Sequence, residues 1–195
     1  MINTTPTPSV RLPDAQLTHV GVYVRDLSAM VAFYRRTMGM LLNDFGEMNG
    51  RTLAFLSRSD NEHHQLVLAH DPQRQFGSES SLNQVSFRVE SLAALRDFYL
   101  ALHPLNLAGM EGRHHGNSWS FYFFDPEGNK IEIYAVTQWQ VQQPWRRPMD
   151  LTQPLDVLEQ ETAAYLKEVA HRPLAEWQAE VRERLAEANG HEEAA

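Results

Sequence analysis

The chain has 195 residues, a formal net charge of −8 and no cysteine, and 43% of its residues are apolar. This composition supplies a packed core for one domain and a tail, excludes disulfides and thiolate metal sites, and argues against a nucleic-acid-binding face. No stretch is long and apolar enough to span a membrane. Residues 1–16 have neither the basic start nor the apolar segment of a secretion signal, so we expect a flexible N-terminus and a cytoplasmic protein.

The next part of the chain contains two copies of one pattern. Residues 17–34 (LTHVGVYVRDLSAMVAFY) align without a gap with residues 82–99 (LNQVSFRVESLAALRDFY). Each copy begins with alternating apolar residues, which are typical of a strand, and continues with an apolar face at helical spacing. The pattern predicts a duplicated supersecondary unit rather than a long repeat array.

Three further strands are expected in each copy. They lie at 40–46, 51–57 and 63–69 in the first copy and at 105–111, 118–124 and 130–136 in the second. One βαβββ copy is too small to bury a core alone. We therefore predict an α+β fold in which modules 17–70 and 82–136 form a cupped mixed sheet.

After residue 137 the chain changes character. A polar linker with aromatic anchors follows, and amphipathic helices are expected at about 154–170 and 173–188. The predicted organisation is a domain at 17–137 followed by a linker and C-terminal helices at 138–195.

Three polar residues on the predicted strands indicate a metal site. His19 and Gln84 occupy equivalent positions in the first strands of the two copies, and Glu132 lies in the last strand of the second copy. In a cupped sheet these positions face one cavity, and packing does not explain two polar residues at one repeat-related position. An imidazole, an amide oxygen and a carboxylate suit an octahedral divalent ion with open positions. The sequence therefore predicts His19, Gln84 and Glu132 as metal ligands.

The repeat and the segments THVGVYVRDL, FYRRTMGM and YFFDPEGNKIEIY resemble the vicinal oxygen chelate superfamily over about residues 15–137. Within it, the chain is most similar to the type I extradiol dioxygenases. The resemblance implies that EHHQLVL supplies an acid–base residue at His64. It also implies that GRHHGNSWSFYFF supplies His114 and Tyr122, which would polarise a substrate oxygen by hydrogen bonds.

Two of these assignments have rivals in the sequence. His115 competes with His114, because the match of His114 requires a one-residue deletion in the intervening loop. Gln65 competes with His64, because a slip of one residue in strand register exchanges the faces of the two side chains.

The resemblance implies ring cleavage of a small, catechol-like aromatic diol by O₂ at Fe(II), with Mn, Zn or Ni as other ions, in a protein that commonly forms homodimers. Position 84 departs from the pattern, since those dioxygenases have His there. Gln84 also agrees with non-oxidative metalloenzymes of the glyoxalase type, such as isomerases, lyases and thiol transferases. A third function left open is metal-free drug binding, as in the resistance proteins of this superfamily. Neither nucleic acid nor a membrane is expected as a partner.

Overall fold

The first repeat folds as a strand, a helix and three further strands. The computed structural model describes residues 15–75 and 81–190, so most of the predicted flexible N-terminus (1–14) lies outside the described residues. The elements are β1 (Val20–Val24), α1 (Leu27–Met38), β2 (Leu41–Met48), β3 (Arg51–Ser57) and β4 (Leu66–His70). Their sheet has the order β1-β4-β3-β2, in which only the β1–β4 pair is parallel.

Local sequence explains the bounds of α1. The side chain of Asp26 accepts a hydrogen bond from the backbone N–H of Ala29 (2.9 Å), which caps the N-terminus of the helix. Gly39 follows the last turn with φ +62°, a left-handed conformation that glycine adopts without steric cost. Between these caps, Met30, Phe33 and Tyr34 bury the apolar face of the helix against the sheet.

The second repeat follows the same plan. Its elements are β5 (Val85–Arg88), α2 (Leu92–Leu102), a 3₁₀ turn η1 (His103–Leu105), β6 (Glu111–His114), β7 (Ser118–Phe124) and β8 (Lys130–Val136). The predicted strands 118–124 and 130–136 are confirmed. The predicted strand 105–111 is wrong, because η1 and the positive φ angles of Asn106 and Gly109 turn the backbone until Glu111.

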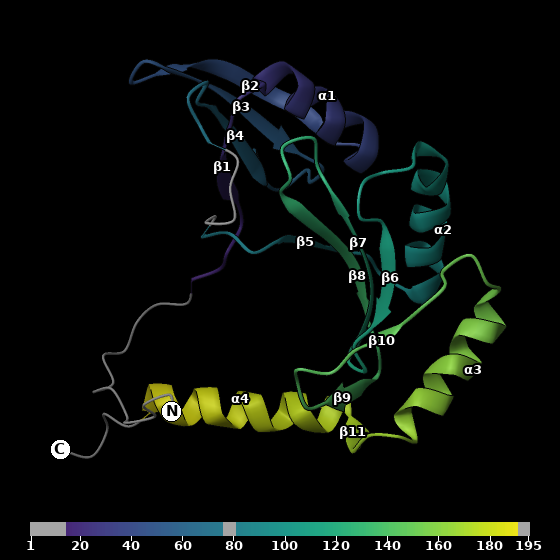
Figure 1. The fold of residues 1–195 in the computed structure, drawn as a ribbon. Coiled ribbons are helices and arrows are strands. Elements are labelled where there is room, and N and C mark those ends of the chain that lie inside the picture. The colour runs from purple at the N-terminus through teal and green to yellow at the C-terminus, as the bar shows by residue number, and fades with distance from the viewer. Residues whose placement is uncertain (1–14, 76–80, 191–195) are drawn as a thin grey trace.

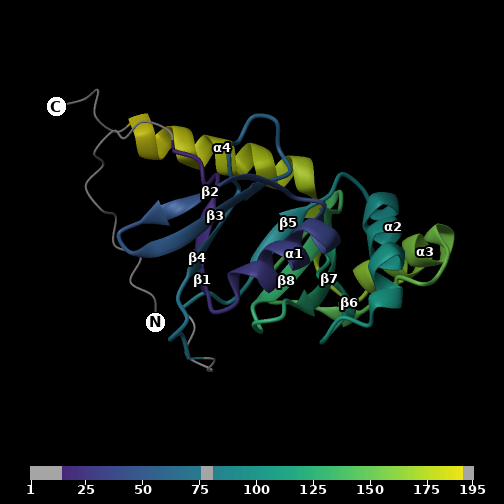
Figure 2. The same ribbon diagram turned by 90° about the horizontal axis from the view of Figure 1, so that it is seen from above.

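The two modules form mixed sheets with helices on their outer faces, as Figures 1 and 2 show. The predicted α+β class is confirmed, but the hydrogen-bonded ladder is interrupted between the modules. The second sheet has the order β10-β6-β7-β8-β5, so β1 and β5 are both edge strands. Residues of both edges line one cavity of about 260 Å³, which places the two first strands side by side.

A turn of the second module ties the two modules together. The carboxylate of Glu127 accepts hydrogen bonds from the backbone N–H groups of Arg25 (2.7 Å) and Asp26 (2.8 Å), just before α1. The Tyr34 hydroxyl of α1 donates to Asp125 (2.9 Å). The segment DPEGN therefore has a structural role in joining the modules, in addition to turning the chain between β7 and β8.

The C-terminal extension wraps around the second module. It contains β9 (Trp139–Val141), β10 (Arg147–Pro148), α3 (Leu155–Leu166), β11 (His171–Pro173) and α4 (Leu174–Gly190). β10 extends the second sheet beside β6, α3 contacts α2, and α4 reaches away from the modules in Figure 1. Both predicted C-terminal helices are confirmed, with α3 ending earlier than expected. No helix of the described residues is long and apolar enough to cross a membrane.

Candidate active site

Glu132 is the centre of a polar group on the inner face of the second sheet. Strand register places Tyr122 of β7 and Ser86 of β5 directly beside it. One carboxylate oxygen accepts a hydrogen bond from the Tyr122 hydroxyl (2.5 Å). The other accepts from the Ser86 hydroxyl (2.6 Å) and from the Gln84 amide (2.8 Å). Glu132 is thus a buried carboxylate whose oxygens are both held in position.

His115 extends this group by one residue. Its Nε2 lies 2.9 Å from the Tyr122 hydroxyl oxygen, and its Nδ1 lies 3.1 Å from the backbone carbonyl of Trp145. The carbonyl only accepts hydrogen bonds, so Nδ1 carries a proton. The Tyr122 hydroxyl joins the imidazole to the carboxylate, and the three groups form a path along which a proton can move between His115 and Glu132.

Tyr122 acts in this path as a protonated phenol. Burial and the hydrogen bond to the Glu132 carboxylate raise the pKa of Tyr122 far above its ordinary value. A phenolate at this position would face an anion across 2.5 Å. Tyr122 is therefore a hydrogen-bond donor at neutral pH rather than a base.

A cavity of about 500 Å³ opens in front of His115 and Tyr122, and the linker residues 143–146 line one side of it. The basic side chains that line it are Arg113, Lys130 and Arg146. Arg113 forms an ion pair with Glu111, whereas the Lys130 ammonium lies 4.6 Å from the centroid of the Tyr122 ring. The charge of this lining favours a substrate that binds as an anion.

The first module contributes histidines at the other edge of the site. The rings of His19 and His64 lie 4.6 Å apart between centroids, and Nδ1 of His64 lies 3.0 Å from Nδ1 of His63. Burial, together with His19 and His63, lowers the pKa of His64 below 6.5, so the ring is neutral at pH 7. His19 and Gln84 line the same cavity between β1 and β5.

The structure separates the two rival histidines of the second module. His114 is fully buried on the opposite side of β6 and contacts Thr162 of α3 through Nε2 (3.2 Å). His115 lies one residue beyond the end of β6 and contacts Tyr122. The predicted pairing of Tyr122 with His114 is therefore not what the structure shows, because neighbouring residues at the end of a strand face opposite sides of the sheet.

The structure also places Gln65, the predicted rival of His64, and adds site residues that the sequence did not predict. Gln65 lines the cavity between β1 and β5, but its amide oxygen accepts a hydrogen bond from the backbone N–H of Arg58 (3.0 Å). Ser86 was missed in the sequence, although it lies two residues from Gln84 and strand alternation predicts that both share a face. Lys130 and Arg146 were also missed, although Lys130 lies within the segment YFFDPEGNKIEIY.

Two of the three predicted metal ligands lie close together. The Gln84 amide and the Glu132 carboxylate lie 2.8 Å apart, and adjacent ligands of an octahedral ion with bonds of about 2.1 Å lie about 3 Å apart. A flip of the Gln84 amide by about 180° exchanges its nitrogen and oxygen, and the oxygen would then face a metal ion bound to Glu132. Among the described residues, no three His, Asp or Glu side chains gather closely enough to hold a metal. A site here therefore requires the Gln84 oxygen as well as His19 and Glu132.

The fold agrees with that of known proteins. The sequence profile of the Glyoxalase/Bleomycin resistance protein/Dioxygenase superfamily matches residues 16–133, which include almost all of both modules. The chain belongs to this superfamily. Its C-terminal extension lies beyond the matched residues. The comparison with curated protein sequences gave no match.

Solved structures of the superfamily resemble the two modules. A glyoxylase/bleomycin resistance protein/dioxygenase domain from Frankia sp. EAN1pec superposes with a TM-score of 0.55 at 19% identity, covering 64% of this chain and 100% of its own. The fosfomycin resistance protein FosX from Listeria monocytogenes gives a TM-score of 0.52 at 18% identity, covering 64% and 96%.

A mutant of the same FosX protein has been solved in complex with Mn(II) and 1S,2S-dihydroxypropylphosphonic acid. It superposes with a TM-score of 0.51 at 16% identity, covering 64% of this chain and 95% of its own. At these identities the similarity shows the fold alone, and the FosX complex shows that a protein of this fold binds a divalent metal. The predicted closeness to extradiol dioxygenases stays a prediction.

Proposed function

We propose that the protein is a metal-dependent extradiol dioxygenase that opens the ring of a catechol-like diol next to its two hydroxyl groups. In this reaction both atoms of O₂ enter the ring-opened product. The observation that carries the proposal is the Tyr122 hydroxyl, which joins His115 to Glu132 beside Gln84. This is the arrangement that the resemblance implies for a His–Tyr pair beside a metal-binding carboxylate.

His19, Gln84 and Glu132 would hold the ion, with the adjacent Gln84 and Glu132 head groups as neighbouring ligands. When bound, the ion would supply the Lewis acidity that makes the diol more acidic and the redox chemistry that activates O₂. Fe(II) is the ion that the resemblance implies. The two oxygen donors from Gln84 and Glu132 are also suited to Mn(II), since hard ligands prefer hard ions.

The remaining residues would bind the substrate and move its protons. His64, neutral at pH 7, lies beside His19 and would accept a proton from the diol. His115 and Tyr122 line the cavity and would contact a substrate oxygen there, and His115 takes the part first assigned to His114. Lys130 and Arg146 would stabilise the anionic diolate in the cavity that they line.

A second candidate is a non-oxidative metalloenzyme of the glyoxalase type, and Gln84 favours it. An amide oxygen in place of imidazole binds Fe(II) less well and leaves a harder ligand set. In that enzyme the path from His115 through Tyr122 to Glu132 would move a proton of the substrate without consuming O₂. Both candidates share the same ligands and the same cavity.

The experiment that separates them is oxygen uptake. The protein is loaded anaerobically with Fe(II), mixed with catechol, 3-methylcatechol and 3,4-dihydroxybenzoate in turn, and exposed to air. We expect a yellow product and one O₂ consumed per diol, with the acidic diol bound more tightly. Glu132→Gln serves as the inactive control. Absence of O₂ uptake with every diol in fully iron-loaded protein contradicts the dioxygenase and leaves the non-oxidative candidate.

A further inference from the structure

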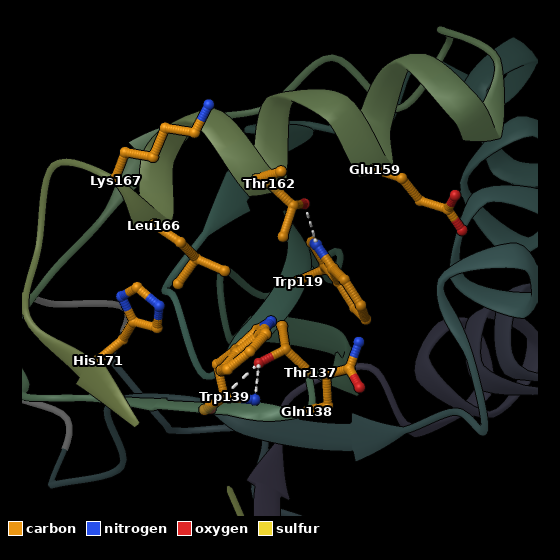
Figure 3. A pocket seen from close by; sticks show the side chains of 10 residues that line it. Trp119, Thr137, Gln138, Trp139, Glu159, Thr162, Leu166, Lys167 and His171 are labelled. Atoms are coloured by element: carbon orange, nitrogen blue, oxygen red, sulfur yellow. Dashed lines mark hydrogen bonds between the residues drawn. The ribbon is translucent and has the colours of Figure 1, made fainter. Parts of the chain in front are cut away.

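The C-terminal extension creates a further cavity on the opposite face of the second sheet from Glu132. Trp119 of β7 and Trp139 of β9 line it, together with Leu166 of α3 (Figure 3). Its volume is about 520 Å³, and most of its lining is apolar. The superfamily profile ends at residue 133, so several walls of this cavity belong to the part of the chain that the profile does not reach.

Hydrogen bonds hold the walls of the cavity apart. The Trp119 indole donates to the Thr162 hydroxyl (2.9 Å), as Figure 3 shows. The Thr137 hydroxyl donates to the Gly116 carbonyl (2.7 Å) and accepts from the backbone N–H of Trp139 (3.1 Å). The Trp119 indole is thus fixed to α3, the backbone of Trp139 is fixed by Thr137, and the Trp139 ring packs edge-on against His171, so the cavity is preformed. A preformed apolar cavity of this size with a few polar groups is typical of a small-molecule site.

The rim of the cavity supplies those polar groups. Glu159, Gln138 and Lys167 line it, and none of their side chains has a hydrogen bond or ion pair with another described residue. Figure 3 shows that the Lys167 ammonium and the Glu159 carboxylate are both directed away from the two indoles, while His171 lies at the opposite end of the cavity from Glu159. Glu159 is the acidic residue of this lining and supplies its negative charge.

We propose that this cavity binds a small, flat aromatic amine in its protonated form. The aromatic body would pack against Trp119 and Trp139, whose electron-rich faces attract cations. The ammonium group would lie at the rim beside Glu159. The net charge of −8 favours the approach of a cation. The site is independent of the reaction at Glu132, because its lining shares no residue with that cavity.

The test compares three probes that share an indole ring, namely tryptamine, indole and indole-3-acetate, by calorimetric titration of the full-length protein. We expect tryptamine to bind most tightly and indole-3-acetate most weakly. Glu159→Gln should weaken tryptamine binding about two- to five-fold, as expected for one partly exposed charge contact, and leave indole unchanged. Glu161→Gln is the matched control, since it removes the same charge from α3 without lining the cavity.

A second variant keeps the test independent of charge. Ala163 lines the cavity from the last turn of α3. Ala163→Phe should fill the space and abolish binding of tryptamine and indole, while circular dichroism shows an unchanged fold. Equal binding of all three probes, or binding that survives Ala163→Phe, overturns the proposal. A dimer that Ala163→Phe dissociates, seen by sedimentation, also overturns it, because a second copy would then occupy the cavity.

Discussion

His114 makes the stability of the protein sensitive to acid. The ring is fully buried among Trp119, Trp145 and Tyr165. Its Nδ1 accepts a hydrogen bond from the backbone N–H of Gly116 (2.8 Å). Protonation would place a second N–H against this donor and a charge in an apolar environment. Burial, reinforced by the neighbouring His115, accordingly lowers the pKa of His114 from 6.5 to about 4.

The difference between the pKa of His114 in the folded protein and in the unfolded chain determines the sign and size of the pH effect on stability. Below pH 6.5 the unfolded chain binds a proton that the folded protein does not take up until about pH 4. The stabilisation is therefore fully present above pH 6.5 and is lost as the pH falls toward 4, by about 3 kcal/mol in total. Between pH 7 and pH 5, the free energy of unfolding should fall by about 2 kcal/mol from His114 alone.

Urea unfolding of wild type and His114→Gln at pH 7 and pH 5 measures this contribution. His114→Gln should be less stable at pH 7, but its stability should fall by about 2 kcal/mol less on acidification than that of wild type. His103→Gln, which removes an exposed histidine, should keep the wild-type pH dependence. An equal loss on acidification in wild type and His114→Gln would refute the assignment.

Three further variants test other parts of the structure. Tyr122→Phe breaks the path between His115 and Glu132, and steady-state kinetics of the metal-loaded enzyme should show kcat lowered by about 10²-fold with metal content unchanged. Gln84→His should tighten Fe(II) binding about tenfold or more in competition with a chelator, and unchanged affinity would argue against position 84 as a ligand. Glu127→Ala removes the acceptor of two backbone N–H groups and should cost about 3 kcal/mol in urea unfolding, whereas the exposed Asp156→Ala should cost less than about 0.5 kcal/mol.

Strict strand alternation made part of the site predictable from the sequence. Gln84, Tyr122 and Glu132 lie in or next to strands whose apolar residues alternate, so one register places all three on the inner face. The sequence left His115 open against His114, because it did not reveal the bounds of β6 or its register on β7, which decide which of two neighbouring residues faces the site. The strand expected at 105–111 does not form, because turn residues in this segment outweigh its apolar pattern.

Contacts made by the extension could not be predicted in the same way. Arg146 reaches the cavity beside Tyr122 because the linker folds back over the second sheet, and no local pattern encodes that path. The sequence indicated aromatic anchors after residue 137 but not the cavity that Trp139 encloses with Trp119, whose indole is held by Thr162 of α3. Such tertiary hydrogen bonds depend on residues far apart in the sequence.

The most direct test of the proposed metal site is the metal content of the protein after reconstitution. Wild type, Glu132→Gln and Glu111→Gln are each incubated with Fe(II) or Mn(II) without oxygen, desalted and analysed by mass spectrometry of the metal. We predict one ion per chain in wild type and in Glu111→Gln, whose carboxylate lines the cavity but pairs with Arg113, and almost none in Glu132→Gln. Wild-type protein that retains neither ion, or Glu132→Gln that retains as much as wild type, would contradict a metal site formed by His19, Gln84 and Glu132.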